Sequence, residues 1–447
     1  MSALTEDAAV ATCDVLVVGG GPAGSTAAAL LARQGRSVVL VEKAHHPRFH
    51  IGESLLPANV KLFDRLGLRS ELERIGIVKR GIEFVSTEHA HSSFLEFADA
   101  WDKTMPYAWQ VRRSVLDEIL FRHAAASGAQ ALEGCRVTQV EFDGAGVSAR
   151  ALMQDGTPRR WRARYLLDAT GRDTLLAAKM GLKRKSDEHG SAAIFGHFRN
   201  ARRLEGRLEG NISIFWFDHG WFWFIPLADG STSVGAVCWP YYLKSRDKPL
   251  REFFADTIAL APGLQDRLRE ATLIDDMVYA TGNYSYASTR ACGERHALLG
   301  DAFAFIDPVF SSGVYFAMRS AFAATELVAA ELDHPEQAPA ARRRYWEIAH
   351  KGPQEFSWFI YRMTNPAMRQ LFMHPANPLR VKEAVLSLLA GDIHERTPIW
   401  RALWLFKAIY YLTWLGNAPT AWRAWRARRR NIQQVGATKG ENVLVES

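Results

Sequence analysis

The start of the chain alternates between short apolar runs and glycine-rich breaks. Residues Cys13–Val18 form a mostly apolar run that ends at glycines, which is typical of a short buried strand. An Ala- and Leu-rich helix is predicted over Pro22–Gln34, and Gly35 ends it. Ser37–Glu42 is predicted to be a second strand. Together these elements make a βαβ unit of about 30 residues.

The middle of the chain has a different pattern. Short aromatic or β-branched runs, separated by Gly or Asp, predict antiparallel strands at 137–152, 194–199, 213–218, 221–226 and 231–239. Helical periodicity returns at 313–332, and everything after about residue 340 is predicted to be helical. We therefore expect an α/β protein with a Rossmann-type domain, an antiparallel-sheet domain and a helical C-terminal region.

Composition and charge exclude several classes of protein. The chain has 447 residues, of which 48% are hydrophobic, and a net charge of +7. This composition is not that of a disordered chain. The four cysteines include no CxxC pair, which excludes a disulfide framework and a cysteine-ligated metal site and indicates a reducing, cytoplasmic location. The N-terminus has acids where a signal peptide has basic residues, so we expect neither a signal peptide nor a membrane span there.

A glycine motif predicts a dinucleotide site. Gly19-x-Gly21-x-x-Gly24 follows the first strand and opens the first helix, and Glu42 closes the second strand. The glycines allow a tight turn, close approach of the backbone to a pyrophosphate, and close packing of helix on strand. The helix N-terminus attracts phosphate, and Glu42 can accept hydrogen bonds from a ribose diol. A structural glycine turn is the alternative.

Further segments, in their order along the chain, resemble the p-hydroxybenzoate-hydroxylase-like class of FAD enzymes. They are Arg113 at the start of a predicted helix, the DATGR run at 168–172, and Gly300-Asp301 after an apolar strand. The resemblance implies that FAD binds between a Rossmann domain and a substrate sheet. The residues expected to bind it are Gly19, Gly21, Pro22, Ala23, Gly24, Glu42, Lys43, Ser54, Arg113, Gly171, Asp301, Pro308 and Gly313.

The same resemblance implies a domain division. FAD-binding parts are expected at 1–80, 111–185 and 286–340, substrate-sheet parts at 81–110 and 186–285, a helical region at 341–432 and a polar tail at 433–447.

Two motifs resemble flavin-dependent halogenases. Trp221-x-Trp223-x-Ile-Pro matches the WxWxIP signature, and both indoles lie on one face of a strand, where they would keep substrate away from the flavin. The FxxPxxSxG signature spans residues 305–313 and leads into a helix with free N–H groups. The resemblance implies that the Ser312 and Gly313 amides bind a halide. Core tryptophans and an ordinary helix cap are the alternatives.

Two further segments strengthen the resemblance. Lys79, in GIVKRGIEF, matches the segment that carries the essential lysine of halogenases. Arg80 is expected to lower the pKa of Lys79 if both side chains are buried. The HIGESLLP run at 50–57, which includes Ser54, matches a segment that lies along the flavin. A solvated surface lysine is the alternative interpretation of Lys79.

One position departs from the family pattern. Tryptophan halogenases have a glutamate before the Ser-x-Gly element, whereas this chain has Phe310. The PVFSSG form resembles the phenol- and pyrrole-acting branch. The expected substrate is therefore an electron-rich phenol, pyrrole or indole, free or tethered to an acyl or peptidyl carrier protein, and free tryptophan is not favoured.

The resemblance implies a reaction and a partner. FADH2 and O2 would oxidise chloride or bromide to hypohalous acid, and Lys79 would present the halogen to the aromatic ring. No second GxGxxG motif occurs, so the reduced flavin is expected from an NAD(P)H-dependent flavin reductase. Two alternatives remain open. One is a monooxygenase or geranylgeranyl-reductase-like reaction on the same scaffold, and the other is a non-enzymatic flavin-binding protein.

The basic charge is concentrated near the C-terminus. Residues 396–430 contain eight Lys and Arg and no acid, together with five tryptophans, so the net charge gives no reason to expect nucleic-acid binding. Three interpretations of this region stay open. They are an aromatic lid over the substrate site, an interfacial helix that makes peripheral membrane contact, and a docking patch for an acidic carrier protein.

Overall fold

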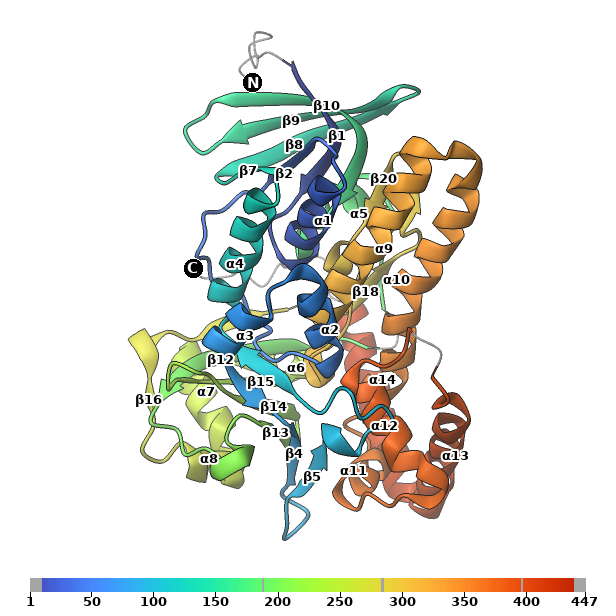
Figure 1. Cartoon of the computed structure of the whole chain (residues 1–447). Helices are drawn as coiled ribbons and strands as arrows, with labels where there is room; N and C mark the ends of the chain where they lie inside the picture. The colour runs from blue at the N-terminus through green and yellow to red at the C-terminus, as the bar shows by residue number, and fades with distance from the viewer. Residues whose placement is uncertain (1–9, 187–188, 283–284, 395–396, 438–447) are drawn as a thin grey trace.

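The structure is a computed structural model and describes residues 10–186, 189–282, 285–394 and 397–437. Two large sheets lie one above the other in Figure 1, with long helices along one side. The upper sheet has the strand order β19-β20-β10-β1-β2-β7, and β9 joins β8 to β10. Its strands are β1 (Val10–Val18), β2 (Val38–Val41), β7 (Gln130–Leu132), β8 (Cys135–Asp143), β9 (Gly146–Met153), β10 (Pro158–Asp168), β19 (Cys292–Gly293) and β20 (His296–Leu298).

The upper sheet confirms the predicted βαβ unit. Strands β1, β2, β7, β10 and β20 run parallel, and α1 (Pro22–Arg33) connects β1 to β2. Alternation of parallel strands with helices is the arrangement of Rossmann-type domains. Helix α1 packs between α4 (Arg113–Ala126) and α9 (Gly313–Asp333), and α10 (Ala338–Ile360) packs on α9. The predicted strands at 137–152 belong to this sheet as the β8–β9 hairpin.

The lower sheet has the order β16-β12-β15-β14-β13-β4-β5, with β17 on β12. Its strands are β4 (Gly81–Ser86), β5 (Ser93–Glu96), β12 (Ala192–Arg199), β13 (Ile212–Phe217), β14 (Gly220–Pro226), β15 (Thr232–Cys238), β16 (Thr272–Leu273) and β17 (Tyr279–Thr281). All these pairings are antiparallel except β4 with β13, which is parallel. The antiparallel pairing predicted for the strands at 194–239 is confirmed, and the parallel pair arises where β4, from earlier in the chain, joins β13. A parallel pair needs a long connection, and the chain supplies it between residues 86 and 212.

The two faces of the lower sheet have different partners. Phe222 and Phe224 point to the face covered by the short helices α6 (Pro240–Lys244), α7 (Leu250–Ala259) and α8 (Pro262–Arg267). Trp221 and Trp223 point to the other face, into the larger apolar cluster of the protein. This alternation follows from the period-2 geometry of a strand. It directs the two tryptophans into the same apolar cluster as Leu55 and Phe97.

Smaller elements join the two sheets. The ribbon of β3 (Gly76–Lys79) and β6 (Ala108–Val111) lies beside α2 (Pro57–Leu66) and α3 (Arg69–Ile75). Helix α5 (Leu175–Lys179) follows β10. A three-stranded sheet consists of β11 (Lys183–Lys185), β18 (Tyr286–Ser288) and β21 (Ala304–Phe305).

The C-terminal region is helical, as predicted. It contains α11 (Pro366–Met373), α12 (Val381–Ala390), α13 (Trp400–Gly416) and α14 (Ala418–Ala437). The polar tail was expected from residue 433, but α14 continues to Ala437, and residues 438–447 lie outside the described part of the chain. Within the described residues, no helix has the length and apolar character needed to cross a membrane.

The glycine turn after β1 gives a test of the fold. A Cβ on Gly24 would lie 1.9 Å from the Gly19 carbonyl oxygen, so Gly24→Ala forces the turn and α1 apart. We expect a loss of about 1–3 kcal/mol in the free energy of unfolding, the usual cost of overpacking, together with weaker FAD binding. Denaturant unfolding and flavin titration measure both. Gly144→Ala is the matched control because a Cβ there has nothing within 4 Å, and an equal loss in both variants would contradict the expectation.

Candidate active site

The N-terminus of α1 is open for an anionic ligand. Gly21 is the N-cap residue, and no side chain caps this helix end. A Cβ on Gly21 would touch only Arg48 Nη2, at 3.5 Å, so the backbone there is accessible to a ligand. The first N–H groups of a helix have no intrahelical partner and attract phosphate. This end of α1 therefore fits the pyrophosphate of a dinucleotide.

Arg48 is a neighbour of this turn that the sequence reasoning missed. Its guanidinium lies 3.5 Å from Glu42 and 3.4 Å from Asp117. Its Nε is buried and has no hydrogen-bond partner among the described residues. An unsatisfied buried donor is unusual, and a phosphate oxygen is a suitable acceptor for it. The residues around the turn thus fit FAD.

Glu42 and Lys43 have partners within the protein. Glu42 Oε2 accepts from Gly20 N at 2.8 Å, and Oε1 accepts from Ala44 N at 3.0 Å. Each carboxylate oxygen has a second lone pair, so Glu42 can hold the turn and still accept from a ribose. The ammonium group of Lys43 is paired with Asp173 at the surface.

Arg113 lies at the start of α4, as predicted, and is buried in an ion pair. Its Nε and Nη2 donate to the two carboxylate oxygens of Asp117 at 2.8 and 3.0 Å, and Nη1 donates to the Ile51 carbonyl at 3.0 Å. Burial favours a neutral Asp117, but the ion pair with Arg113 keeps the pKa of this carboxyl below its usual value. Arg113 therefore anchors the segment that begins at Ile51.

Asp301 connects the predicted flavin segments. It lies in the turn after β20 and is half-buried, and Gly171 lies in the turn after β10. Burial raises the pKa of Asp301 to about 6, while the charges of Arg172 and Arg113 oppose this rise. The turn at 300–302 packs against the turn at 171–173, so the structure brings these two predicted flavin segments together.

Lys79 is almost completely removed from solvent. Its side chain is 1% exposed, and its Nζ donates to Ser54 Oγ at 2.9 Å and to the Leu55 carbonyl at 3.1 Å. The ring of Phe97 lies 5.3 Å from the Nζ. Burial lowers the pKa of Lys79 to about 7. The alternative of a solvated surface lysine is thus wrong.

Arg80 does not contribute to this shift. Its side chain is exposed, and its backbone N–H donates to Asn211 Oδ1. Burial of Lys79 accounts for its lowered pKa, and the condition under which Arg80 was expected to assist, burial of both side chains, is not met. Successive residues of an extended segment point in opposite directions, which separates the two side chains.

Trp221 and Trp223 lie side by side on β14. Their ring centroids are 6.2 Å apart, and Trp223 Nε1 donates to Ser233 Oγ at 3.1 Å. Both are buried in the apolar cluster that also contains Leu55 and Phe97, the neighbours of Lys79. A Cβ on Gly235 would meet the Trp223 ring at 2.3 Å, so this glycine makes room for the indole.

The predicted halide segment forms a sharp turn into α9. Pro308 begins a short 3-10 helix, and Ser311 has a left-handed φ of 57°. Ser312 is the N-cap residue of α9 and makes no side-chain cap, which leaves the first N–H groups, beginning at Gly313, available to an anion. Phe310, the residue that departs from the tryptophan-halogenase pattern, is buried against Phe356.

A buried acid–imidazole pair is a second feature that sequence reasoning missed. His197 Nε2 lies 3.0 Å from Glu53 Oε2, and both side chains are buried. Glu53 adjoins Ser54, and Val111 N donates to the Glu53 carbonyl at 2.8 Å. The pair ties β12 to the segment that accepts the hydrogen bonds of Lys79. Its available signal was Glu53 inside the HIGESLLP run.

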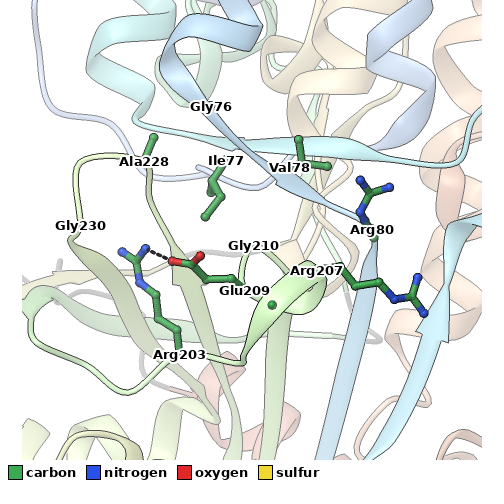
Figure 2. A pocket seen from close by; sticks show the side chains of 11 residues that line it. Gly76, Ile77, Val78, Arg80, Arg203, Arg207, Glu209, Gly210, Ala228 and Gly230 are labelled. Atoms are coloured by element: carbon green, nitrogen blue, oxygen red, sulfur yellow. Dashed lines mark hydrogen bonds and ion pairs between the residues drawn. The ribbon is translucent and has the colours of Figure 1, made fainter.

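A separate cleft lies along β3. Figure 2 shows Ile77, Val78, Arg80, Arg203 and Arg207 around it, and its volume is about 590 Å³. Arg203 is paired with Glu209 and Arg207 with Glu96. Neither Lys79 nor the two tryptophans line this cleft. It is therefore distinct from the apolar cluster around Lys79.

Comparisons with known proteins identify the family. A protein-family profile described as "FAD binding domain" matches residues 12–343. Flavin-dependent halogenase armH3 of Armillaria mellea is 34% identical over 347 residues, which are 71% of this chain and 68% of that protein. This chain belongs to the flavin-dependent halogenases with that FAD-binding domain.

Two other similar proteins are also named as halogenases. Flavin-dependent halogenase rdc2 of Metacordyceps chlamydosporia is 36% identical over 72% of this chain and 65% of its own length. Tryptophan 2-halogenase of Chondromyces crocatus is 36% identical over 74% of this chain and 64% of its own length. The chain thus spans just under two thirds of the length of these relatives.

Solved structures show the same fold. The myxobacterial chondrochloren halogenase CndH is 30% identical, with a TM-score of 0.76 over 91% of this chain and 97% of that one. A flavoprotein/dehydrogenase from Cytophaga hutchinsonii is 27% identical, with a TM-score of 0.82 over 91% of this chain and 100% of that one.

The burial of Lys79 gives a pH-dependent prediction. Because the pKa of Lys79 falls from 10.5 to about 7 on folding, the unfolded chain binds more protons between these values, and stability rises with pH there. Lys79→Met removes the penalty of a buried charge, and we expect it to raise the free energy of unfolding below pH 7, by on the order of 5 kcal/mol at most. The gain should shrink toward pH 10.

Denaturant unfolding at pH 6 and pH 9.5 measures this difference. Lys103→Met, at an exposed lysine, is the matched control and should show little pH-dependent gain. A gain for Lys79→Met that is equal at the two pH values would contradict the expected pKa.

Proposed function

We propose that this chain halogenates an electron-rich aromatic compound with chloride or bromide, using FADH2 and O2. The observation that carries the proposal is the buried amine of Lys79, whose neighbours Leu55 and Phe97 belong to the apolar cluster that also contains Trp221 and Trp223. Membership of the flavin-dependent halogenases supports it. The residues that would hold FAD are those around the α1 N-terminus, with Arg48, Glu42 and Asp301. When bound and reduced, FAD would supply two of the four electrons that O2 accepts, and the halide would supply the other two as it is oxidised to hypohalous acid.

The amide groups of Ser312 and Gly313 are proposed to bind the halide. They lie at the uncapped N-terminus of α9, where the helix dipole favours an anion. Asp307, the nearest acid in the sequence, is occupied by hydrogen bonds from Ser191 Oγ at 2.8 Å and with His189 Nε2 at 3.0 Å. This reduces the repulsion that a free carboxylate would exert on a halide.

Lys79 is proposed to transfer the halogen. A neutral amine attacks the halogen of hypohalous acid, an N–halogen bond forms, the O–halogen bond breaks, and water is released. The ring carbon then takes the halogen from nitrogen, and its proton returns the amine to its starting state. In the alternative form of this step, the protonated amine of Lys79 donates a hydrogen bond to hypohalous acid, and the ring carbon takes the halogen directly from oxygen. A pKa of about 7 makes both protonation states accessible near neutral pH.

The aromatic substrate is proposed to be a phenol, pyrrole or indole that needs no activating carboxylate. Phe310 offers no base at the position where tryptophan halogenases have glutamate. Although one relative is named tryptophan 2-halogenase, that name concerns the relative. The substrate is either free or tethered to a carrier protein, and a flavin reductase supplies FADH2. Trp221 and Trp223 would keep the ring away from the flavin.

Loss of the Lys79 amine tests the proposal. With a flavin reductase, NADH, FAD, O2 and bromide, mass spectrometry of a panel of phenols, pyrroles and indoles should show a brominated product. Lys79→Ala should lower its formation by about 10²-fold or more, the scale for removal of a group that acts in the transition state, while FAD binding persists. Lys103→Ala should keep full activity. An oxygenated product without halogen, unaffected by Lys79→Ala, would instead indicate a monooxygenase.

The pH dependence separates the two forms of the step. If the neutral amine accepts the halogen, the rate at which bound hypohalous acid is converted to halogenated product should rise with pH through about 7. Above that pH the rate should level off. If the ammonium group donates a hydrogen bond, the rate should fall through the same range. Single-turnover assays with pre-reduced enzyme, from pH 5.5 to 9, would measure it. A flat profile would contradict a role for the titration of Lys79.

A further inference from the structure

Helix α13 is apolar on two faces. Leu403, Phe406 and Tyr410 are buried, and the rings of Phe406 and Tyr410 contact Phe359 and Trp358 of α10 at centroid distances of 5.6 and 5.3 Å. This inner face accounts for the attachment of α13 to the protein. An amphipathic helix on a protein surface would present polar residues on its other face.

The outer face of α13 is largely apolar as well, although the exposed Arg401 lies on it one turn before Trp404. Trp404 is 73% exposed, Leu412 68% and Leu415 62%, and Tyr411 is also exposed. These positions are related by spacings of seven, eight and eleven residues, which place them on one side of a helix. We name Trp404, Tyr411, Leu412 and Leu415 the outer stripe. It runs for roughly 17 Å along the helix axis.

Helix α14 adds tryptophans paired with arginines. Trp422 and Trp425 are exposed, the Arg426 guanidinium lies 3.5 Å from the centre of the Trp422 ring, and that of Arg429 lies 4.8 Å from the Trp425 ring. Arg423 is exposed beside them. Ala421, one turn before Trp425, is buried and marks the side on which α14 meets the protein. Residues 396–430 contain eight basic residues and no acid, so the charge here is uniformly positive.

We propose that α13 and α14 bind the surface of a membrane that contains anionic lipid, with the outer stripe among the acyl chains and the arginines at the headgroups. The combination of leucine, tryptophan and arginine on helices of this kind is the composition of interfacial helices, and indoles favour the zone between hydrocarbon and water. Anionic headgroups complement a segment that has no acid.

Other occupants fit less well. A second copy of this chain would bring two uniformly positive segments together, which is repulsive. An acidic carrier protein would match the arginines, but interfaces between transient partners are not as apolar as the outer stripe. An aromatic lid over the substrate site would use the inner face, which is already packed on α10. The proposal is independent of the chemistry at Lys79.

Vesicle flotation with the full-length protein tests the proposal. We expect binding to vesicles of phosphatidylcholine with 30% phosphatidylglycerol, and much weaker binding to phosphatidylcholine alone or in high salt. Arg423→Gln with Arg426→Gln should weaken partitioning roughly tenfold or more, and so should Leu412→Ser with Leu415→Ser. Leu260→Ser, an exposed leucine on the lower sheet domain, and Arg136→Gln, an exposed arginine on β8, are the matched controls and should bind as the parent does.

Three results would overturn the proposal. The first is no vesicle binding by the parent protein. The second is equal binding to both kinds of vesicle without salt dependence, because the charge would then play no part. The third is concentration-dependent dimerisation in size-exclusion chromatography that Leu412→Ser abolishes, because the outer stripe would then be an interface between copies. Thermal unfolding of each variant shows that lost binding is not lost folding, and these results do not depend on whether the protein halogenates.

Discussion

The burial of one amino group constrains the architecture between the two sheets. Transfer of a charged amine from water to an apolar interior is costly, and the acceptors of Lys79 among the described residues are Ser54 Oγ and the Leu55 carbonyl. In the described part of the chain, no carboxylate contributes to its shifted pKa, so no counter-charge there offsets the cost. Burial therefore lowers the pKa of Lys79 enough that the uncharged amine is populated near pH 7. An amine in this state is a better nucleophile than a solvated lysine.

The acceptors of Lys79 depend on contacts from several parts of the chain. The segment 53–55 is paired with β6, since Leu55 N donates to the Trp109 carbonyl and Val111 N to the Glu53 carbonyl. Strand β6 is in turn paired with β3, which ends at Lys79. His197 holds Glu53 from the lower sheet, and Arg113 holds Ile51 from the upper domain. The surroundings of Lys79 are thus set by both sheets at once.

Local sequence patterns predicted the elements whose residues are close together in the sequence. The βαβ unit and the alternating faces of β14 follow from apolar runs and from the period of a strand, and the structure confirms both. The parallel pairing of β4 with β13 was not predictable, because it joins residues more than a hundred positions apart. The same holds for the Glu53–His197 pair, and Arg48 follows no motif.

Lys79 and Arg80 show that burial, and not proximity in sequence, decides which charges act on a side chain. Neighbouring basic residues suggested mutual repulsion, but the strand directs Arg80 outward, and burial alone acts on Lys79. The dinucleotide role of Gly19, Gly21 and Gly24 followed from their spacing between a strand and a helix. The roles of Lys79, Ser312 and Gly313, in contrast, came from resemblance, since nothing in the spacing around Ser312 distinguishes a halide site from a helix cap. Their chemistry stays a prediction until the reaction is measured.

The burial of residues on helix α13 distinguishes between the interpretations of the C-terminal region that the sequence pattern alone left open. A helix with apolar residues on two faces predicts two partners, but the sequence does not say which face meets which partner. The structure assigns Leu403, Phe406 and Tyr410 to α10 and leaves Trp404, Leu412 and Leu415 in solvent. An exposed leucine side chain has an unfavourable contact with water. A lipid phase or a protein partner that covers these leucines would remove that contact. The uniform positive charge of the segment favours an anionic lipid surface, because headgroups neutralise arginines without the shape complementarity that a protein partner needs.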